Sequence, residues 1–257
     1  ILKYGKKLQK AFEGPAGPAL RKWIDDCPND IYSALTYKGG AAWREHLEND
    51  LKGAAERAGA FHRRYAGKLT RLDGAALGAA IAEYEAIQES LGRIMSFAQL
   101  VYSGDMSDPK IGRFYQSMQE RSTAISTDLV FFTLELNCLE ESDLQGKLAA
   151  PELARYAPWL RDLRAMRPHQ LSDEIERLLH EKYVAGRAAW TRLFDETMAG
   201  LRFPFQSEQL TSAEILNRLT DRDPAARREA AKSLGQVLGE NSRIFTLITN
   251  TLAKDKE

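Results

Sequence analysis

Hydrophobic positions in this chain recur every three or four residues over most of its length, which is the spacing of an amphipathic helix. Between residues 41 and 66, apolar side chains with this spacing are separated by charged residues. A further series begins after residue 73, and later helical stretches cover residues 151–166 and 172–199. Pro151 and Ser172 stand at the start of the last two, where both residue types are favoured. The pattern therefore predicts a chain that is almost entirely helical.

Two of the helical stretches carry a seam whose steps alternate between three and four residues. The first seam consists of Tyr84, Ile87, Leu91, Ile94, Ala98 and Val101, and the second of Ile111, Tyr115, Met118, Ser122, Ile125, Leu129, Phe132 and Leu136. A polar turn at residues 104–109 separates them, and there Asp108 can cap a helix that Pro109 begins. Two long seams joined by a short loop predict an antiparallel helical hairpin. We expect an all-α fold in which such hairpins pack as a multi-helix bundle.

Few residues favour a strand. The run 201–205 is the most strand-like, and Pro204 weakens even this prediction because proline cannot donate a ladder hydrogen bond. Downstream, residues 211–214 form a capping box, and Asp223 with Pro224 starts another helix. This last helix resembles one helix of a HEAT repeat, but a single copy cannot build a solenoid. We therefore interpret it as ordinary helix packing and expect little or no strand.

Charge and cysteine content narrow the class of protein. The 257 residues include 36 Lys and Arg against 36 Asp and Glu, so the chain lacks the long-range field that attracts nucleic acid or an anionic membrane surface. Cys27 and Cys138 are too few for a disulfide scaffold, and no apolar run approaches the length of a membrane span. We expect a cytoplasmic chain with neither nucleic acid nor membrane as a partner.

The histidines do not form a metal-binding pattern. The four are His46, His62, His169 and His180. A zinc-hydrolase helix needs two histidines four residues apart with a glutamate after the first. His180 and Glu181 begin that pattern, but Val184 occupies the position of the second histidine. We therefore expect no metal ligand in this chain, and we interpret His180 as a surface residue paired with Glu176.

Two further groups of polar residues each allow two interpretations. Glu135 interrupts an apolar stretch, either as an exposed helix position or as a buried carboxyl group that holds a proton. Arg161, Arg164 and Arg167 form either a solvated helix face, the interpretation we favour, or a clamp for a carboxylate or phosphate. Glycine-rich phosphate loops, nucleophile elbows and Cys-x-x-Cys pairs are absent from the sequence. The sequence thus assigns no catalytic residue and no metal ligand, and it leaves the substrate-binding residues open.

Several short motifs follow one another over residues 46–257. The densest lie in residues 169–182 and 186–196. The others are Tyr65-x-Gly67-Lys68-Leu69, Ser107-Asp108-Pro109, Phe131-Phe132-x-Leu134-Glu135-Leu136 and residues 249–256. In this order the motifs resemble the N-terminal helical region of oligoendopeptidase F, a zinc metallopeptidase of the thimet oligopeptidase clan. The resemblance implies a helical part that covers a deep cleft and restricts it to short, unfolded peptides.

The resemblance also implies a domain organisation. It implies a helical-hairpin domain of oligoendopeptidase F type over residues 46–200 and the start of a following helical region over residues 201–257, and it leaves residues 1–45 unassigned. Because glycines and prolines interrupt every period there, we expect residues 1–45 to be an irregular N-terminal segment with short helices. The His-Glu-x-x-His helix of the family and its third ligand, a glutamate, would lie beyond Glu257, so no catalytic residue transfers to this chain. Zinc belongs to the full-length enzyme and not to this part of it.

Two functions follow as expectations. In the first, the chain is the non-catalytic N-terminal part of a zinc metallo-endopeptidase whose partners are short oligopeptide substrates, and it limits their access to the cleft. In the second, the chain is a stand-alone helical module that binds other proteins without catalysis, as the two seams and the neutral, charge-mixed surface would allow.

Overall fold

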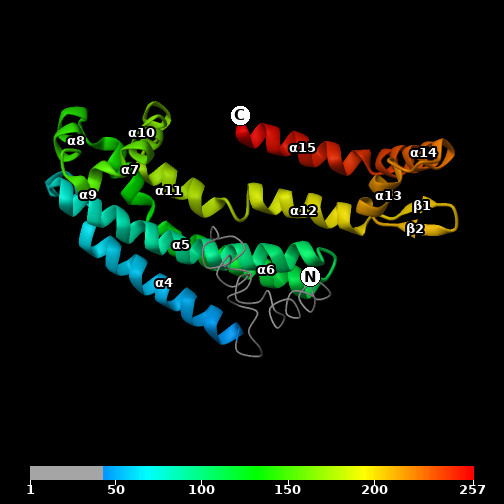
Figure 1. The fold of residues 1–257 in the computed structure, drawn as a ribbon, viewed down its shortest axis with the longest axis horizontal. Coiled ribbons are helices and arrows are strands. Elements are labelled where there is room, and N and C mark those ends of the chain that lie inside the picture. The colour runs from blue at the N-terminus through cyan, green and yellow to red at the C-terminus, as the bar shows by residue number, and fades with distance from the viewer. Residues whose placement is uncertain (1–42) are drawn as a thin grey trace, which may run out of the picture. The chain divides into compact units, whose positions relative to one another are not determined.

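The computed structural model describes residues 43–257, and the predicted irregular segment at residues 1–45, with Cys27, lies almost entirely outside this range (Figure 1). Helices dominate the described residues, so the all-α prediction is confirmed. They are α4 (Trp43–Tyr65), η2 (Leu69–Arg71), α5 (Gly74–Gly104), α6 (Pro109–Thr127), α7 (Val130–Cys138), α8 (Glu141–Lys147), α9 (Pro151–Ala154), α10 (Ala157–Arg164), η3 (Arg167–His169), α11 (Asp173–Lys182), α12 (Arg187–Gly200), α13 (Ser212–Arg218), α14 (Pro224–Glu240) and α15 (Ser242–Lys256). Two short strands, β1 (Phe203–Phe205) and β2 (Glu208–Leu210), complete the fold.

The described chain forms two compact units. Unit 1 comprises residues 43–104 and 114–182, and unit 2 comprises residues 105–113 and 183–257. The chain therefore changes unit three times, after Gly104, within α6 after Arg113, and at the end of α11. The domain boundaries predicted after residues 45 and 200 remain predictions. In the part of the chain that the structure describes, no helix combines the length and the hydropathy that crossing a membrane requires.

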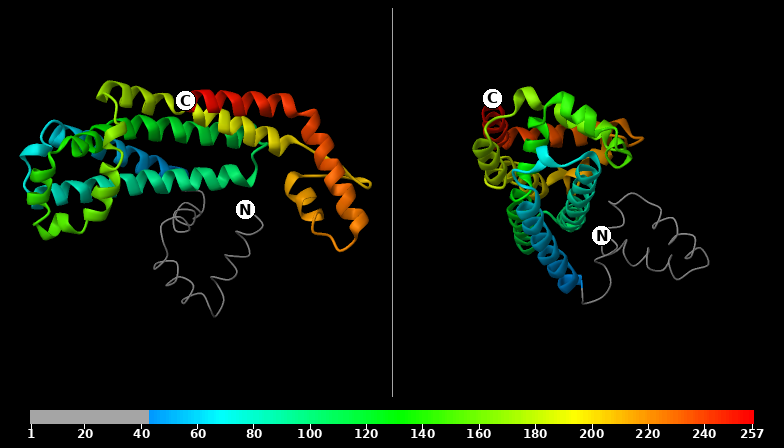
Figure 2. Two further views of the ribbon diagram at one scale, coloured as in Figure 1. Left: turned by 90° about the horizontal axis from the view of Figure 1, so that it is seen from above. Right: turned by 90° about the vertical axis from the view of Figure 1, so that its left-hand side faces the viewer.

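Unit 1 is built on the predicted antiparallel pairing of two long helical segments. The α5 seam is buried at Ile87, Leu91, Ile94 and Ala98. Ring contacts join Phe97 to Phe114 and Tyr84 to Phe132, so the later part of α5 meets the start of α6 and the earlier part meets α7. This order is antiparallel, and α6 runs alongside α5 in Figure 2. Helix α4 packs on α5 and adds Phe61 to the same core.

The second predicted seam is interrupted once, at residues 128–129. The hydroxyl groups of Ser126 and Thr127 both donate to the Thr123 carbonyl oxygen, at 3.1 and 2.9 Å. Such back-bonding competes with the regular helix ladder. The next two backbone amides, of Asp128 and Leu129, donate to the carbonyls of Ile125 and Ser126, three residues back, which is the tighter 3₁₀ pattern. Helix α6 therefore ends at Thr127, and α7 begins with the same apolar face still buried.

Two helices expected to be continuous are divided in the structure. The stretch 151–166 forms α9 and α10, because Pro158 occupies the first turn of a new helix and cannot continue the earlier one. The stretch 172–199 forms α11 and α12, with turns between Tyr183 and Gly186. Gly186 is the residue at which the sequence suggested a bend, and it stands at the N-terminal cap of α12.

Unit 2 contains a short β-hairpin, of which the sequence indicated only the first strand, and that one weakly. Phe203 pairs with Leu210 and Phe205 with Glu208, while Pro204 faces outward between them. A two-stranded hairpin tolerates proline because its edge has no further strand to bond. The strand is stabilised by burial of both phenylalanines against α13 and α14. The capping box at residues 211–214 and the cap that starts α14 are present as predicted.

Candidate functional site

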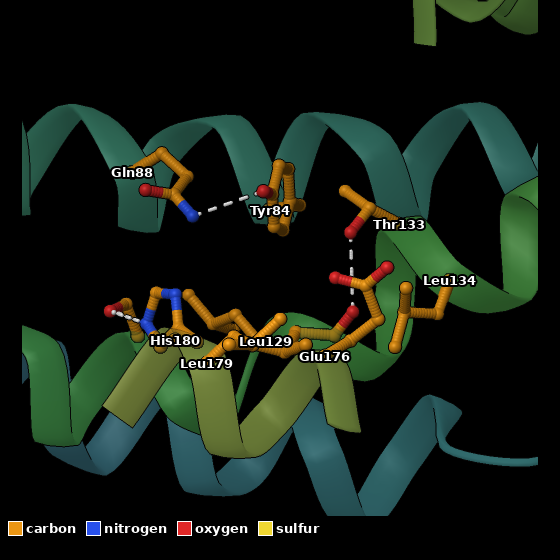
Figure 3. A pocket seen from close by; sticks show the side chains of 10 residues that line it. Tyr84, Gln88, Leu129, Thr133, Leu134, Glu176, Leu179 and His180 are labelled. Carbon is orange, nitrogen blue, oxygen red and sulfur yellow. Dashed lines mark hydrogen bonds between the residues drawn. The ribbon is translucent and has the colours of Figure 1, made fainter. Parts of the chain in front are cut away.

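A pocket in unit 1 lies between α5, the junction of α6 with α7, and α11 (Figure 3). Its volume is about 330 Å³, which is at the lower end of the range for small-molecule sites. One part of the lining is apolar and the other is polar and able to form hydrogen bonds. The apolar residues are Leu129, Val130, Leu134 and Leu179, and the polar ones are Tyr84, Gln88, Ser126, Thr133, Glu176 and His180.

Helix α5 contributes a hydrogen-bonded pair to one wall. The ring of Tyr84 packs 5.0 Å from that of Phe132 and 6.2 Å from that of Trp159, which places its hydroxyl at the edge of the pocket. The amide nitrogen of Gln88, one turn later, donates to the Tyr84 hydroxyl oxygen at 3.0 Å. Burial raises the pKa of Tyr84. The phenol therefore keeps its proton and can still donate it to a group in the pocket.

Helix α11 forms the opposite wall and brings His180 to α6. Its Nε2 atom lies 2.7 Å from the Ser126 hydroxyl oxygen, so the predicted pairing of His180 with Glu176 is wrong. Burial lowers the pKa of His180, which favours the neutral imidazole near pH 7. Ser126 also bonds to a carbonyl within its own helix. We interpret the contact between Ser126 and His180 as a link that fixes α11 against α6.

Glu176 supplies the charge of the pocket. Its Oε1 atom accepts a hydrogen bond from the backbone amide of Leu171 at 2.9 Å, which satisfies a free donor before the first turn of α11. The carboxylate points from α11 into the space below Tyr84 and Thr133 (Figure 3). Among the residues that line this pocket, Glu176 is the only one of the Asp, Glu, Lys and Arg types.

Glu135 joins two of the motifs that carry the family resemblance. Its Oε1 atom accepts a hydrogen bond from the backbone amide of Gly67 at 2.6 Å, between segments 68 residues apart in the sequence. Gly67 has a φ of 73°, a left-handed conformation that glycine adopts without the penalty of a Cβ atom. Glu135 itself is half-buried. The carboxylate thus anchors the turn after α4.

The three arginines of the predicted cluster do not converge. Arg164, whose side chain is 10% exposed, donates to the Leu136 carbonyl at 2.9 Å and to Glu141 at 3.0 Å. It therefore satisfies the C-terminal end of α7, and the solvated-face prediction is wrong for this residue. Arg161 is 76% exposed and pairs with its neighbour Asp162, as a solvated face predicts. Arg167 approaches Glu140 at 3.9 Å.

The histidines occupy α4, η3 and α11. His46 is exposed on α4, and the Nδ1 atom of His62 lies 3.0 Å from the Asp128 carbonyl oxygen. His169 ends the short helix η3, and His180 bonds to Ser126. Over residues 43–257, no three His, Cys, Asp or Glu residues gather where they could hold a metal ion. The described residues therefore do not fit a catalytic zinc site.

The sequence did not single out Gln88 or Ser126. Ser126 follows Ile125 in the second seam, and its position beside the apolar face was a weak signal that a polar group approaches the core. Tyr84 belonged to the first seam and was expected only to pack. The chemistry of these residues depends on α11, which arrives from 40 or more positions later in the chain. The local spacing of apolar residues does not predict the contact of α11 with α5 and α6.

Helix α11 exposes an apolar face. None of its residues is buried, and Ile175, Leu178 and Leu179 are 45, 60 and 52% exposed. Three large apolar side chains on one helix in contact with water cost free energy unless another surface covers them.

Comparisons with known proteins agree on one family. A family model described as Oligopeptidase F matches residues 135–203. Oligopeptidase PepF of Bacillus subtilis (strain 168) is 25% identical over 189 residues, covering 68% of this chain and 28% of the relative. The crystal structure of oligoendopeptidase-F from Enterococcus faecium shares the fold, with a TM-score of 0.71 at 20% identity over 82% of this chain and 43% of the other. The chain thus spans less than half the length of both relatives. These matches confirm that the chain resembles the N-terminal portion of oligoendopeptidase F.

Proposed function

We propose that this chain is the N-terminal helical part of a zinc metallo-endopeptidase that hydrolyses short oligopeptides. The observation that supports the proposal most strongly is the match of residues 135–203 to the Oligopeptidase F family, which runs from α7 to the start of β1. In the complete enzyme, a bound zinc ion would polarise the peptide carbonyl and activate water. The role of this chain is to supply helical walls that admit short, unfolded peptides to the cleft and exclude folded proteins.

The proposal gives this chain a structural role and not a catalytic one. Within residues 43–257, the histidines and carboxylates are dispersed and do not assemble a set of zinc ligands. The proposal assigns the chemical step to another part of the complete enzyme. Residues such as Glu135 and Arg164 stabilise the helical wall, since each satisfies the backbone at the end of a helix or turn.

The first experiment measures metal content and peptidase activity on the purified chain. We expect no stoichiometric zinc by elemental analysis and no cleavage of a quenched fluorescent oligopeptide, with and without added zinc. A purified full-length oligoendopeptidase F serves as the positive control in the same assay. Tight binding of one zinc ion per chain, or steady turnover, would contradict the proposal.

A second experiment examines the gene itself. Sequencing the source gene past the codon for Glu257 should find an in-frame His-Glu-x-x-His motif, because the relatives extend well beyond the matched region. If the motif is present, the helical part and the chemistry belong to one polypeptide. A stop codon directly after Glu257 would instead favour the alternative function.

The alternative is a stand-alone helical module that binds another protein. The observation in its favour is the exposed apolar face of α11 at Ile175, Leu178 and Leu179. A module of this kind would lose partner binding when Leu178→Ser makes that face polar, whereas Lys182→Ser, one turn along the same helix, would change it little. Light scattering and titration with candidate partners would measure both effects, and an unchanged affinity for both variants would remove the alternative.

A further inference from the structure

The pocket between α5 and α11 has an electrostatic character that favours one class of ligand. Glu176 brings a negative charge, and no lysine or arginine is among the lining residues. His180 adds no compensating charge, because burial favours its neutral form. An anionic ligand would meet repulsion without a counter-charge, whereas a cation would meet attraction in a partly desolvated space, where the effective dielectric is lower than in water.

The geometry of the carboxylate distinguishes between two kinds of cation. One oxygen of Glu176, Oε1, is already engaged by the backbone amide of Leu171. A guanidinium group binds best when both carboxylate oxygens accept in parallel, and here the bond from Leu171 already takes one acceptor position of Oε1, which disfavours the bidentate pair. A primary ammonium group is compact and needs separate acceptors at short range. The second Glu176 oxygen supplies one. Thr133 lines the same pocket, and because its hydroxyl donates to the Val130 carbonyl, the hydroxyl oxygen can still accept a hydrogen bond.

The remaining walls match an aliphatic stem. Leu129, Val130, Leu134 and Leu179 line the pocket next to the polar groups. The aromatic ring of Tyr84 stands on the facing helix, and such a ring attracts a cation near its face. A chain of about four methylene groups that ends in an ammonium would therefore bury its apolar part against the leucines, and removal of this apolar surface from water would favour binding.

We propose that the pocket formed by α5, the α6–α7 junction and α11 binds an aliphatic primary ammonium group, with Glu176 as its anion and the Thr133 hydroxyl oxygen as a further acceptor. The site goes beyond the proposed peptidase function and does not depend on it. The ammonium can come from a free alkylamine or from the side chain of a lysine in a peptide. These two sources share the same chemistry, and the experiment separates them.

The test titrates the purified chain with three ligands of equal length: n-butylammonium, n-butanol and butyrate. Isothermal titration calorimetry and amide chemical shifts measure binding. We expect n-butylammonium to bind and to shift the signals of residues in α11 and at the α6–α7 junction. Binding of n-butanol should be weaker by about tenfold or more and butyrate should not bind, because only the ammonium forms a charge-assisted hydrogen bond with Glu176.

Two variants locate the effect. Glu176→Gln removes the charge but keeps an oxygen that can accept from Leu171, so α11 should stay capped. It should weaken n-butylammonium binding by about tenfold or more and leave n-butanol unchanged. Glu181→Gln is the matched control, since Glu181 is an exposed carboxylate on the same helix that pairs with Arg177 and does not line the pocket. It should leave binding of all three ligands unchanged.

A last pair of ligands identifies the source. Nα-acetyl-lysine amide should bind as n-butylammonium does if a peptide lysine is accommodated, and Nα-acetyl-norleucine amide provides the neutral control. Binding of the free amine alone would restrict the site to small amines. The proposal is overturned if the ammonium and the alcohol bind equally well, if none of the ligands binds, or if Glu181→Gln weakens binding as much as Glu176→Gln does. Because the comparison of ligands uses the unmodified chain, it decides the matter even if a variant fails to fold.

Discussion

Gly78, in the first third of α5, offers a sharp test of how unit 1 is packed. A Cβ atom at this position would lie 2.6 Å from both the carbonyl carbon and the oxygen of Glu152, and 2.9 Å from the amide nitrogen of Leu153. All three atoms belong to the backbone of α9, so no flexible side chain can rotate away. Replacement of Gly78 by alanine would therefore force α5 and α9 apart.

The size of the effect follows from two opposing contributions. Ordinary contact begins at 3.4 Å, so α9 would have to shift by roughly 0.8 Å at its closest point. Overpacking of this kind costs about 1–3 kcal/mol. Alanine in a helix interior stabilises by roughly 0.5–1 kcal/mol relative to glycine and offsets part of the cost. We expect Gly78→Ala to lower the free energy of unfolding by about 1–2 kcal/mol.

Gly92 provides a control in the same helix. It is exposed, and a Cβ atom there would meet nothing within 4 Å. Gly92→Ala should therefore raise the free energy of unfolding by roughly 0.5–1 kcal/mol through helix propensity alone. The same chemical change in one helix thus has opposite signs, and the difference isolates the contact with α9.

Urea unfolding followed by circular dichroism at 222 nm measures both variants against the unmodified chain. Thermal unfolding gives a second reading, in which 1 kcal/mol moves the Tm by roughly 2–4 °C for a domain of this size. The reasoning is refuted if Gly78→Ala is as stable as the unmodified chain or more so. It is also refuted if Gly92→Ala loses as much stability as Gly78→Ala, since that would place the effect in α5 itself.

Three further changes test other parts of the structure. Arg164→Met should cost about 1.5–3 kcal/mol in urea unfolding, because it removes charge-assisted bonds to α7 and Glu141, whereas Arg161→Met should stay within roughly 0.5 kcal/mol of the unmodified chain. Thr211→Ala should cost about 1 kcal/mol by breaking the capping box of α13, and Thr211→Ser should retain it, as amide exchange at Glu214 would show. Since burial lowers the pKa of His180 in the folded chain, the unfolded chain binds its proton more readily, so stability should fall as pH drops below about 6.5, and His180→Gln should lack this component.

Each of these three predictions has a result that would contradict it. Equal losses for the two arginine variants would mean that burial of Arg164 is unimportant. Fast exchange at Glu214 in both threonine variants would show that the hydroxyl does not cap α13. A pH profile that is identical with and without His180 would place the proton-linked loss of stability in other groups.

The candidate site shows where sequence reasoning stops. The helices that carry Tyr84, Glu176 and His180 were predicted from periodicity and caps, and the structure has helices at all three positions. The partners of these side chains were not predicted. His180 was expected to pair with Glu176 within its own helix, yet its ring bonds to Ser126, 54 residues earlier in the chain. The residue pattern within α11 does not predict a contact between α11 and another helix.

The sequence by itself determined the helical class, the two seams and most helix starts, because these depend on side chains within a few residues of each other. Asp108, Thr211 and Asp223 start helices through bonds to amides two or three positions away. The tertiary structure alone decided that residues 203–205 form a strand, since burial of Phe203 and Phe205 against α13 and α14 outweighs the local penalty of Pro204. The tertiary structure also decided which residues line the pocket. Groups on α5, α6 and α11 meet only because burial of the apolar seams brings distant segments together, and that long-range packing sets which polar atoms face one another.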